Sequence, residues 1–163
     1  MRSIRLLAPL MALVLSACLG STEPERRAEF TDPAEVTFAP ALGVNLAAMT
    51  RTPTGLYYQD LAVGTGAVAG PTDSVHTAYQ GYLSGGTQFT ASAAGDPLRS
   101  RLRSLIAGFQ QGVAGMAPGD RRKLVIPPQL GYGLDDVRAN NGQVVIPANS
   151  VLVFDVELLA RYP

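Results

Sequence analysis

Apolar and polar side chains alternate along two segments of the chain, residues 73–83 and residues 150–159. A period of two places successive side chains on opposite faces of a strand. The positions that share one face are Val75, Thr77 and Tyr79 in the first segment and Leu152, Phe154, Val156 and Leu158 in the second. Both segments therefore predict strands with one face in a core and the other face in water.

Shorter apolar runs predict two further strands, at residues 55–60 and 122–126. The second run stops at two prolines, which cannot donate to a strand ladder. Between the strands, residues 104–116 carry apolar side chains at helical spacing, with Ser104 as the expected N-cap. Together these elements predict an α+β domain in which a mostly antiparallel β-sheet wraps over one short α-helix.

The first residues of the chain have the pattern of an export signal. Arg2 and Arg5 precede an apolar run from Leu6 to Leu15, which is about half the length that a membrane-spanning helix needs. This pattern predicts a lipoprotein signal peptide over residues 1–17, because the residues that lead to Cys18 resemble the bacterial lipobox. We expect Cys18 to carry a lipid after cleavage; the alternative is a stray thiol in an ordinary signal peptide.

Residues 18–50 contain scattered prolines and no sustained hydrophobic period. They predict a lipid-anchored tether, in which a short helix over residues 41–49 is an alternative. Leu19 stands where an aspartate would resemble an inner-membrane retention signal. The expected location is therefore the bacterial cell envelope, exported and anchored to the outer membrane.

Composition excludes several classes of function. The 163 residues carry 13 basic and 13 acidic side chains, so a nucleic-acid-binding surface is not expected. The only histidine, His76, falls on the outer face of its strand and rules out a multi-histidine metal site. Residues 64–69 match a relaxed dinucleotide fingerprint, but a turn follows them where a helix would have to begin. We expect no cofactor and no metal.

Five aromatic residues on the predicted strands, helix and loops remain to be explained: Tyr79, Phe89, Phe109, Tyr132 and Phe154. Inward-facing rings usually belong to a core, and their spacing alone does not distinguish a core from a binding pocket.

Three segments carry a more specific signal: YQGYLSGGTQFTAS, LIAGFQQGVAGMAPGDRRKLVIPPQLGYG and VIPANSVLVFDVELL. They closely resemble the FKBP-type peptidyl-prolyl cis-trans isomerase family, and the resemblance extends over about residues 51–160. It implies a domain over residues 51–163 with a curved antiparallel sheet over a short helix. It also implies an isomerase that acts on X–Pro bonds, takes proline-containing polypeptides as substrates and binds ligands of the macrolide immunosuppressant type.

The resemblance further implies the residues of the site. They are Tyr79, Phe89, Ile106, Phe109, Tyr132, Ile146 and Phe154 as the lining of a proline pocket, with Leu98 and Leu105 beside it. The Ile146 backbone N–H and the Tyr132 hydroxyl are expected to hold a substrate carbonyl. Thr90 stands where the family usually has an aspartate, so it keeps a hydroxyl but not the charge. Two functions stay open: an isomerase that assists protein folding in the envelope, and a non-catalytic module that binds proline-containing chains or a partner protein.

Overall fold

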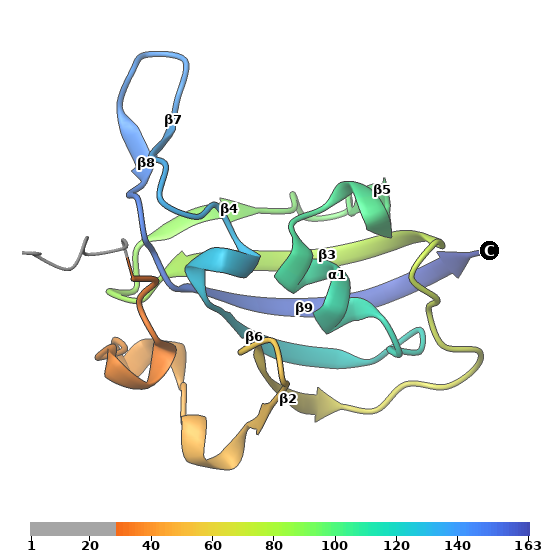
Figure 1. Cartoon of the computed structure of the whole chain (residues 1–163). Coiled ribbons are helices and arrows are strands. Elements are labelled where there is room, and N and C mark those ends of the chain that lie inside the picture. The colour runs from red at the N-terminus through yellow and green to blue at the C-terminus, as the bar shows by residue number, and fades with distance from the viewer. Residues whose placement is uncertain (1–28) are drawn as a thin grey trace, which may run out of the picture.

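The computed structural model describes residues 29–163 (Figure 1). The predicted signal peptide and Cys18 lie outside these residues. Seven strands form one antiparallel sheet: β1 (Thr50–Arg51), β2 (Tyr57–Ala62), β3 (Ser74–Leu83), β4 (Gln88–Ala91), β5 (Leu98–Arg101), β6 (Arg121–Ile126) and β9 (Leu152–Tyr162). Their order is β1-β2-β6-β9-β3-β4, and β5 also pairs with β3. The four strands expected from the sequence are confirmed.

A single α-helix, α1 (Ala107–Val113), is found within residues 29–163 and lies against one face of the sheet (Figure 1). Two shorter strands, β7 (Val137–Arg138) and β8 (Val144–Ile146), form a hairpin that projects from one end of the sheet. Short 3-10 turns complete the chain: Pro33–Glu35, Pro40–Leu42, Leu46–Ala48, Leu102–Ser104 and Pro128–Leu130. The predicted α+β class, a curved sheet over one short helix, is confirmed.

The core lies between α1 and the inner face of the sheet. The inward positions predicted on β3 and β9 are buried there: Val75, Thr77, Leu152, Phe154, Val156 and Leu158 are each at most 4% exposed. The side chain of Thr77 is buried with no hydrogen-bond partner for its hydroxyl. Alternation along these two strands therefore identified the core face correctly.

Helix α1 is shorter than the predicted range of residues 104–116, because residues 102–104 form a 3-10 turn in front of it. Ser104 is not the N-cap; Ile106 occupies that position without a side-chain hydrogen bond. The helix lies directly on β6 through two glycines. A Cβ on Gly108 would lie 2.4 Å from the Ile126 side chain, and a Cβ on Gly112 would lie 2.5 Å from the Leu124 side chain. The close packing of α1 on β6 therefore requires glycine at both positions, although glycine is a poor helix former.

The leading segment, residues 29–49, packs on the outer face of the sheet. Leu42 and Met49 are buried in a second apolar cluster with residues of the sheet and of the loop before β9: Tyr57, Val125, Val151 and Val153. The described part of the predicted tether, residues 29–49, thus packs on the sheet, which the sequence did not indicate. The predicted helix over residues 41–49 is wrong, since two 3-10 turns stand there. The sequence predicted that the outer face of β9 is exposed to water. This is not true at Val153, which is buried under the leading segment.

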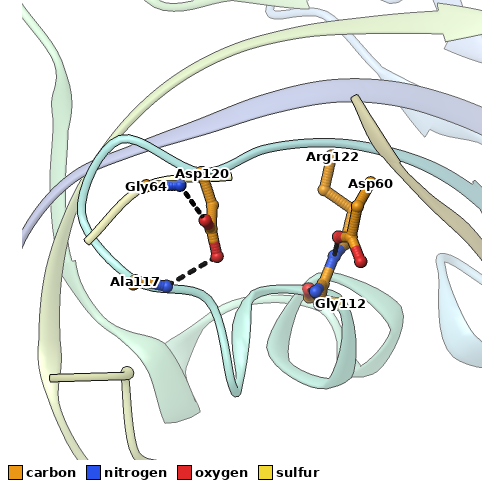
Figure 2. Close-up of polar contacts among 6 residues, drawn as sticks. All are labelled: Asp60, Gly64, Gly112, Ala117, Asp120 and Arg122. Carbon is orange, nitrogen blue, oxygen red and sulfur yellow. Dashed lines mark hydrogen bonds and ion pairs between the residues drawn. The ribbon is translucent and has the colours of Figure 1, made fainter. Parts of the chain in front are cut away.

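The carboxylate of Asp120 joins the loop after β2 to the turn before β6 (Figure 2). It accepts hydrogen bonds from the N–H of Gly64 and, at 2.7 Å, from the N–H of Ala117. The bond from Gly64 and the weaker one from Ala117 hold the pKa of Asp120 below its usual value, although burial acts in the opposite direction. Gly64 begins the glycine pattern that the sequence analysis rejected as a dinucleotide site, and its N–H has a structural role here.

Arg122 ties the helix to the sheet (Figure 2). Its Nε donates to Asp60 at 2.6 Å, and a terminal nitrogen donates to the carbonyl of Gly112, near the carboxyl end of α1, at 2.7 Å. The guanidinium also lies 4.8 Å from the ring centre of Tyr58. These contacts fix the position of the helix, and with it Phe109, against β2 and β6.

Within residues 29–163, no helix has the length and apolarity needed to cross a bilayer.

Candidate functional site

Four aromatic side chains from four different elements meet on the inner face of the sheet: Tyr79 of β3, Phe89 of β4, Phe109 of α1 and Phe154 of β9. The ring of Phe154 lies at the centre, with ring centroids 5.6 Å from Phe89, 5.6 Å from Phe109 and 6.2 Å from Tyr79. Its contacts with Phe89 and Phe109 are edge-to-face, which is a favourable arrangement for two rings. Phe109 and Phe154 are buried in the core, whereas Tyr79 and Phe89 are half-buried, so one side of this ring cluster is accessible to solvent.

Gly81 makes room for this arrangement. In the sheet it lies opposite Thr90 on one side and Phe154 on the other. A Cβ on Gly81 would come within 2.7 Å of the Thr90 methyl group and within 2.7 Å of the Phe154 ring. The sequence analysis did not identify this residue, although a glycine on the inner face of a strand is a known signal of close approach.

Thr90 lies beside the ring cluster, where its hydroxyl oxygen is 3.3 Å from the hydroxyl oxygen of Tyr79. Either hydroxyl can donate in this pair. Thr90, where the family resemblance implies an aspartate, is therefore in contact with the hydroxyl of one of the four aromatic residues. Its side chain offers a neutral hydrogen bond and no charge.

Tyr132 lies in the loop before β7, and Ile146 is the last residue of β8. Ile146 is 3% exposed and packs in the core cluster, whereas Tyr132 is 40% exposed. Burial, and secondarily the phenol of Tyr79, raise the pKa of Tyr132 above its usual value. Its hydroxyl therefore stays protonated at neutral pH and can donate a hydrogen bond. Tyr132 and Tyr79 are close enough for their phenols to interact electrostatically.

The remaining predicted residues divide into two groups. Leu105 and Ile106, which precede α1, are half-buried against the same core cluster as the rings. Leu98 lies opposite Thr77 on the edge strand β5 and is not part of that cluster. Tyr79, Phe89, Leu105, Ile106, Phe109, Ile146 and Phe154 thus share one apolar cluster, whereas Leu98 and Tyr132 are not part of it.

The ring cluster is apolar, and the hydroxyl groups of Tyr79 and Thr90 lie beside it. His76 lies on the outer face, where its ring centroid is 4.7 Å from that of Tyr162. In the described part of the chain, no three His, Cys, Asp or Glu side chains gather in a way that could hold a metal ion. A group of rings with hydroxyls beside it suits a small apolar ligand whose neighbouring carbonyls need hydrogen-bond donors.

A hollow of about 400 Å³ is lined by Gln80 of β3, by Asp155 and Glu157 of β9 and by residues of the 92–97 loop. Tyr79 also lines it, but Phe89, Phe109 and Phe154 do not. The hollow therefore shares one residue with the ring cluster and is otherwise formed by other side chains.

Comparison with protein families gives a match to the family described as FKBP-type peptidyl-prolyl cis-trans isomerase, over residues 66–159. The chain is 44% identical over 110 residues to the FKBP-type peptidyl-prolyl cis-trans isomerase FkpA of Aeromonas hydrophila. It is 42% identical over 111 residues to FkpA of Escherichia coli strain K12. These matches cover 67% and 68% of this chain but only 39% of each relative, so the chain spans about two-fifths of the length of these relatives.

Solved structures give the same result. The crystal structure of FkpA from Escherichia coli matches with a TM-score of 0.63 and 40% identity, over 71% of this chain and 52% of the other. The crystal structure of AtFKBP13 matches with a TM-score of 0.64 and 33% identity, over 70% of this chain and 98% of the other. The family match covers residues 66–159, which include all four rings of the cluster, and the chain belongs to the FKBP-type peptidyl-prolyl cis-trans isomerase family.

Proposed function

We propose that this chain is a peptidyl-prolyl cis-trans isomerase that acts on X–Pro bonds of exported proteins and assists their folding in the cell envelope. The observation that carries the proposal is the meeting of four rings from β3, β4, α1 and β9 around Phe154. Family membership supports the same activity.

Rotation about an X–Pro bond has a barrier of about 18–20 kcal/mol and breaks no covalent bond, so it requires no acid, base or metal. The planar amide is more polar than the twisted one, and an apolar cleft disfavours the planar form relative to the twisted state. A rate acceleration of about 10⁴ needs only about 5.4 kcal/mol of preferential stabilisation. Desolvation and shape can supply an effect of this size.

We assign the proline ring of the substrate to the space between Tyr79, Phe109 and Phe154. The Tyr132 hydroxyl and the Ile146 backbone N–H are the proposed donors to a substrate carbonyl. The Tyr132 side chain is 40% exposed and its phenol is protonated at neutral pH, so its hydroxyl is available as a donor. Macrolide immunosuppressant-type ligands are proposed for the same cleft, on the resemblance to the family.

Thr90 favours a second candidate function. A threonine paired with Tyr79 supplies no negative charge at the rim of the cleft. If isomerase activity in this family depends on that charge, the chain binds proline-containing segments without accelerating their rotation. The cleft and its substrate class are the same under both functions, so only a rate measurement separates them.

The experiment measures the cis-to-trans rate of a short X–Pro peptide, and its affinity, with residues 19–163. The variants are Thr90→Asp, Phe154→Ala and Phe154→Leu, which keeps apolar volume in case the alanine variant fails to fold. Tyr162→Ala is the matched control, because it removes an aromatic ring from the outer face. Acceleration that is lost in the Phe154 variants and kept in the control supports the isomerase. Binding without acceleration until aspartate replaces Thr90 supports the binding module, and no binding at all contradicts both.

We also propose that the chain is exported and anchored by a lipid on Cys18, with the outer membrane as its location. The support is the signal-like pattern of residues 1–17 and the identity of Leu19. Expression of the full chain with a labelled fatty acid tests this proposal. Label should appear on the wild-type chain and be absent from Cys18→Ala; label on both chains, or on neither, rejects the lipid anchor.

A further inference from the structure

Asn149 has an unusual backbone conformation. Among residues 29–163 it is the one residue other than glycine with a positive φ, at 59°. Asparagine tolerates this left-handed conformation better than most side chains do. The residue lies in the short turn between the β7–β8 hairpin and β9, three positions after Ile146.

The side chain of Asn149 holds the leading segment. Its Oδ1 accepts a hydrogen bond from the Thr31 N–H at 3.0 Å, and its Nδ2 donates to the Glu29 carbonyl at 3.2 Å. Both ends of the amide are therefore used by residues that precede it by 118 and 120 positions. A carboxylate could supply only the acceptor, and glycine could supply neither group.

The backbone of Asn149 holds the base of the hairpin. Its N–H donates to the carbonyl of Gly133 at 2.8 Å, and Gly133 directly follows Tyr132 in the chain. The next residue before it, Ala148, donates its N–H to the carboxylate of Asp136 at 2.9 Å. The turn around Asn149 thus joins the two chain segments that carry Tyr132 and Ile146.

We propose that Asn149 is a positioning residue for the peptide-binding end of the cleft, and that residues 29–31 complete its support. The side-chain amide anchors the left-handed turn to the leading segment, and the turn sets the spacing between Tyr132 and Ile146. This inference rests on the proposed function, which assigns those two residues to a substrate carbonyl. It makes the segment that leads from the predicted lipid anchor a part of the site.

The test compares Asn149→Gly with the wild-type full chain. Glycine keeps the left-handed φ but removes both amide contacts, so a role limited to backbone conformation predicts no loss. We expect kcat/KM for the X–Pro peptide to fall about 3- to 10-fold, mostly through KM, because the rings themselves are unchanged. The kcat/KM of Asn149→Asp should lie between that of the wild type and that of Asn149→Gly, because a carboxylate keeps the acceptor but not the donor. Asn45→Gly, at an exposed residue of the leading segment, is the matched control and should leave kcat/KM unchanged.

Amide hydrogen exchange provides a readout that does not depend on catalysis. In Asn149→Gly the N–H of residue 149, which donates to Gly133, should exchange faster although its own partner is intact. Unchanged exchange there, or kcat/KM equal to that of the wild type, overturns the inference. If the wild-type chain binds the peptide without accelerating its rotation, the proposed isomerase activity is rejected. The role of Asn149 is then tested by peptide affinity, which Asn149→Gly should weaken by about 3- to 10-fold. Absence of peptide binding overturns it.

Discussion

Replacing Asp120 by asparagine removes one of the two acceptors that hold the loop after β2 against the turn before β6. The carboxylate accepts from Gly64 and Ala117, whereas an amide has one oxygen and would turn its NH₂ group toward the second N–H. A hydrogen bond to a charged group contributes about 1.5–3 kcal/mol to stability. Because Asp120 is 9% exposed, water cannot freely replace the lost acceptor. We expect the free energy of unfolding to fall by about 2 kcal/mol at pH 7.

The pH dependence has a definite sign. The pKa of Asp120 is lower in the folded chain, so its contribution to stability is complete above the pKa of the unfolded state, about 3.9, and is lost as the pH falls through the folded value. The difference between wild type and Asp120→Asn should therefore narrow as the pH falls below 4. Urea unfolding followed by circular dichroism measures it, since the chain has no tryptophan.

Asp96→Asn is the matched control for this experiment. Asp96 is exposed in the loop between β4 and β5, so the same chemical change should alter stability by less than about 0.5 kcal/mol. The reasoning is refuted if Asp120→Asn costs no more than Asp96→Asn at pH 7. It is refuted equally if the cost is the same at pH 3 as at pH 7, because the charge would then have no part in it.

Three further predictions concern other parts of the fold. Thr77→Val should raise the free energy of unfolding by about 1 kcal/mol in the same urea assay, because it removes a buried hydroxyl with no partner. Leu42→Ala should lower it by about 2–3 kcal/mol, because the leading segment packs on the sheet; a loss below about 0.5 kcal/mol would contradict that packing. Gly81→Ala should lower kcat/KM at least about tenfold by displacing Phe154 and Thr90, whereas Gly85→Ala, which meets open space, should not.

The sequence predicted the sheet well because its main strands are half-buried. Along β3 and β9 the alternation is regular, so the inner faces could be assigned from pattern alone. The helix was less predictable, since Gly108 and Gly112 weaken the helical signal while allowing the contact with β6 that the fold requires. The meeting of four rings from distant segments could be anticipated only from the family resemblance, because periodicity assigns a side chain to a face and not to a partner.

The leading segment shows why other features were missed. Leu42 and Met49 are buried through 3-10 turns whose apolar residues have no regular period, so the segment was interpreted as a tether. The contact of Asn149 with residues 29–31 joins positions more than a hundred residues apart. No local pattern in the sequence reports a contact of that kind.

The central place of β9 in the sheet determines when this chain can fold. Strand β9 pairs with β3 along one edge and with β6 along the other, although it follows both in the chain. In a nascent chain that ends before residue 151, β1-β2-β6 and β3-β4-β5 therefore have no strand between them to pair with, and the leading segment lacks Val151 and Val153 to pack on. Completion of the sheet must await the synthesis of β9, and until then the unpaired strands are accessible to chaperones and proteases.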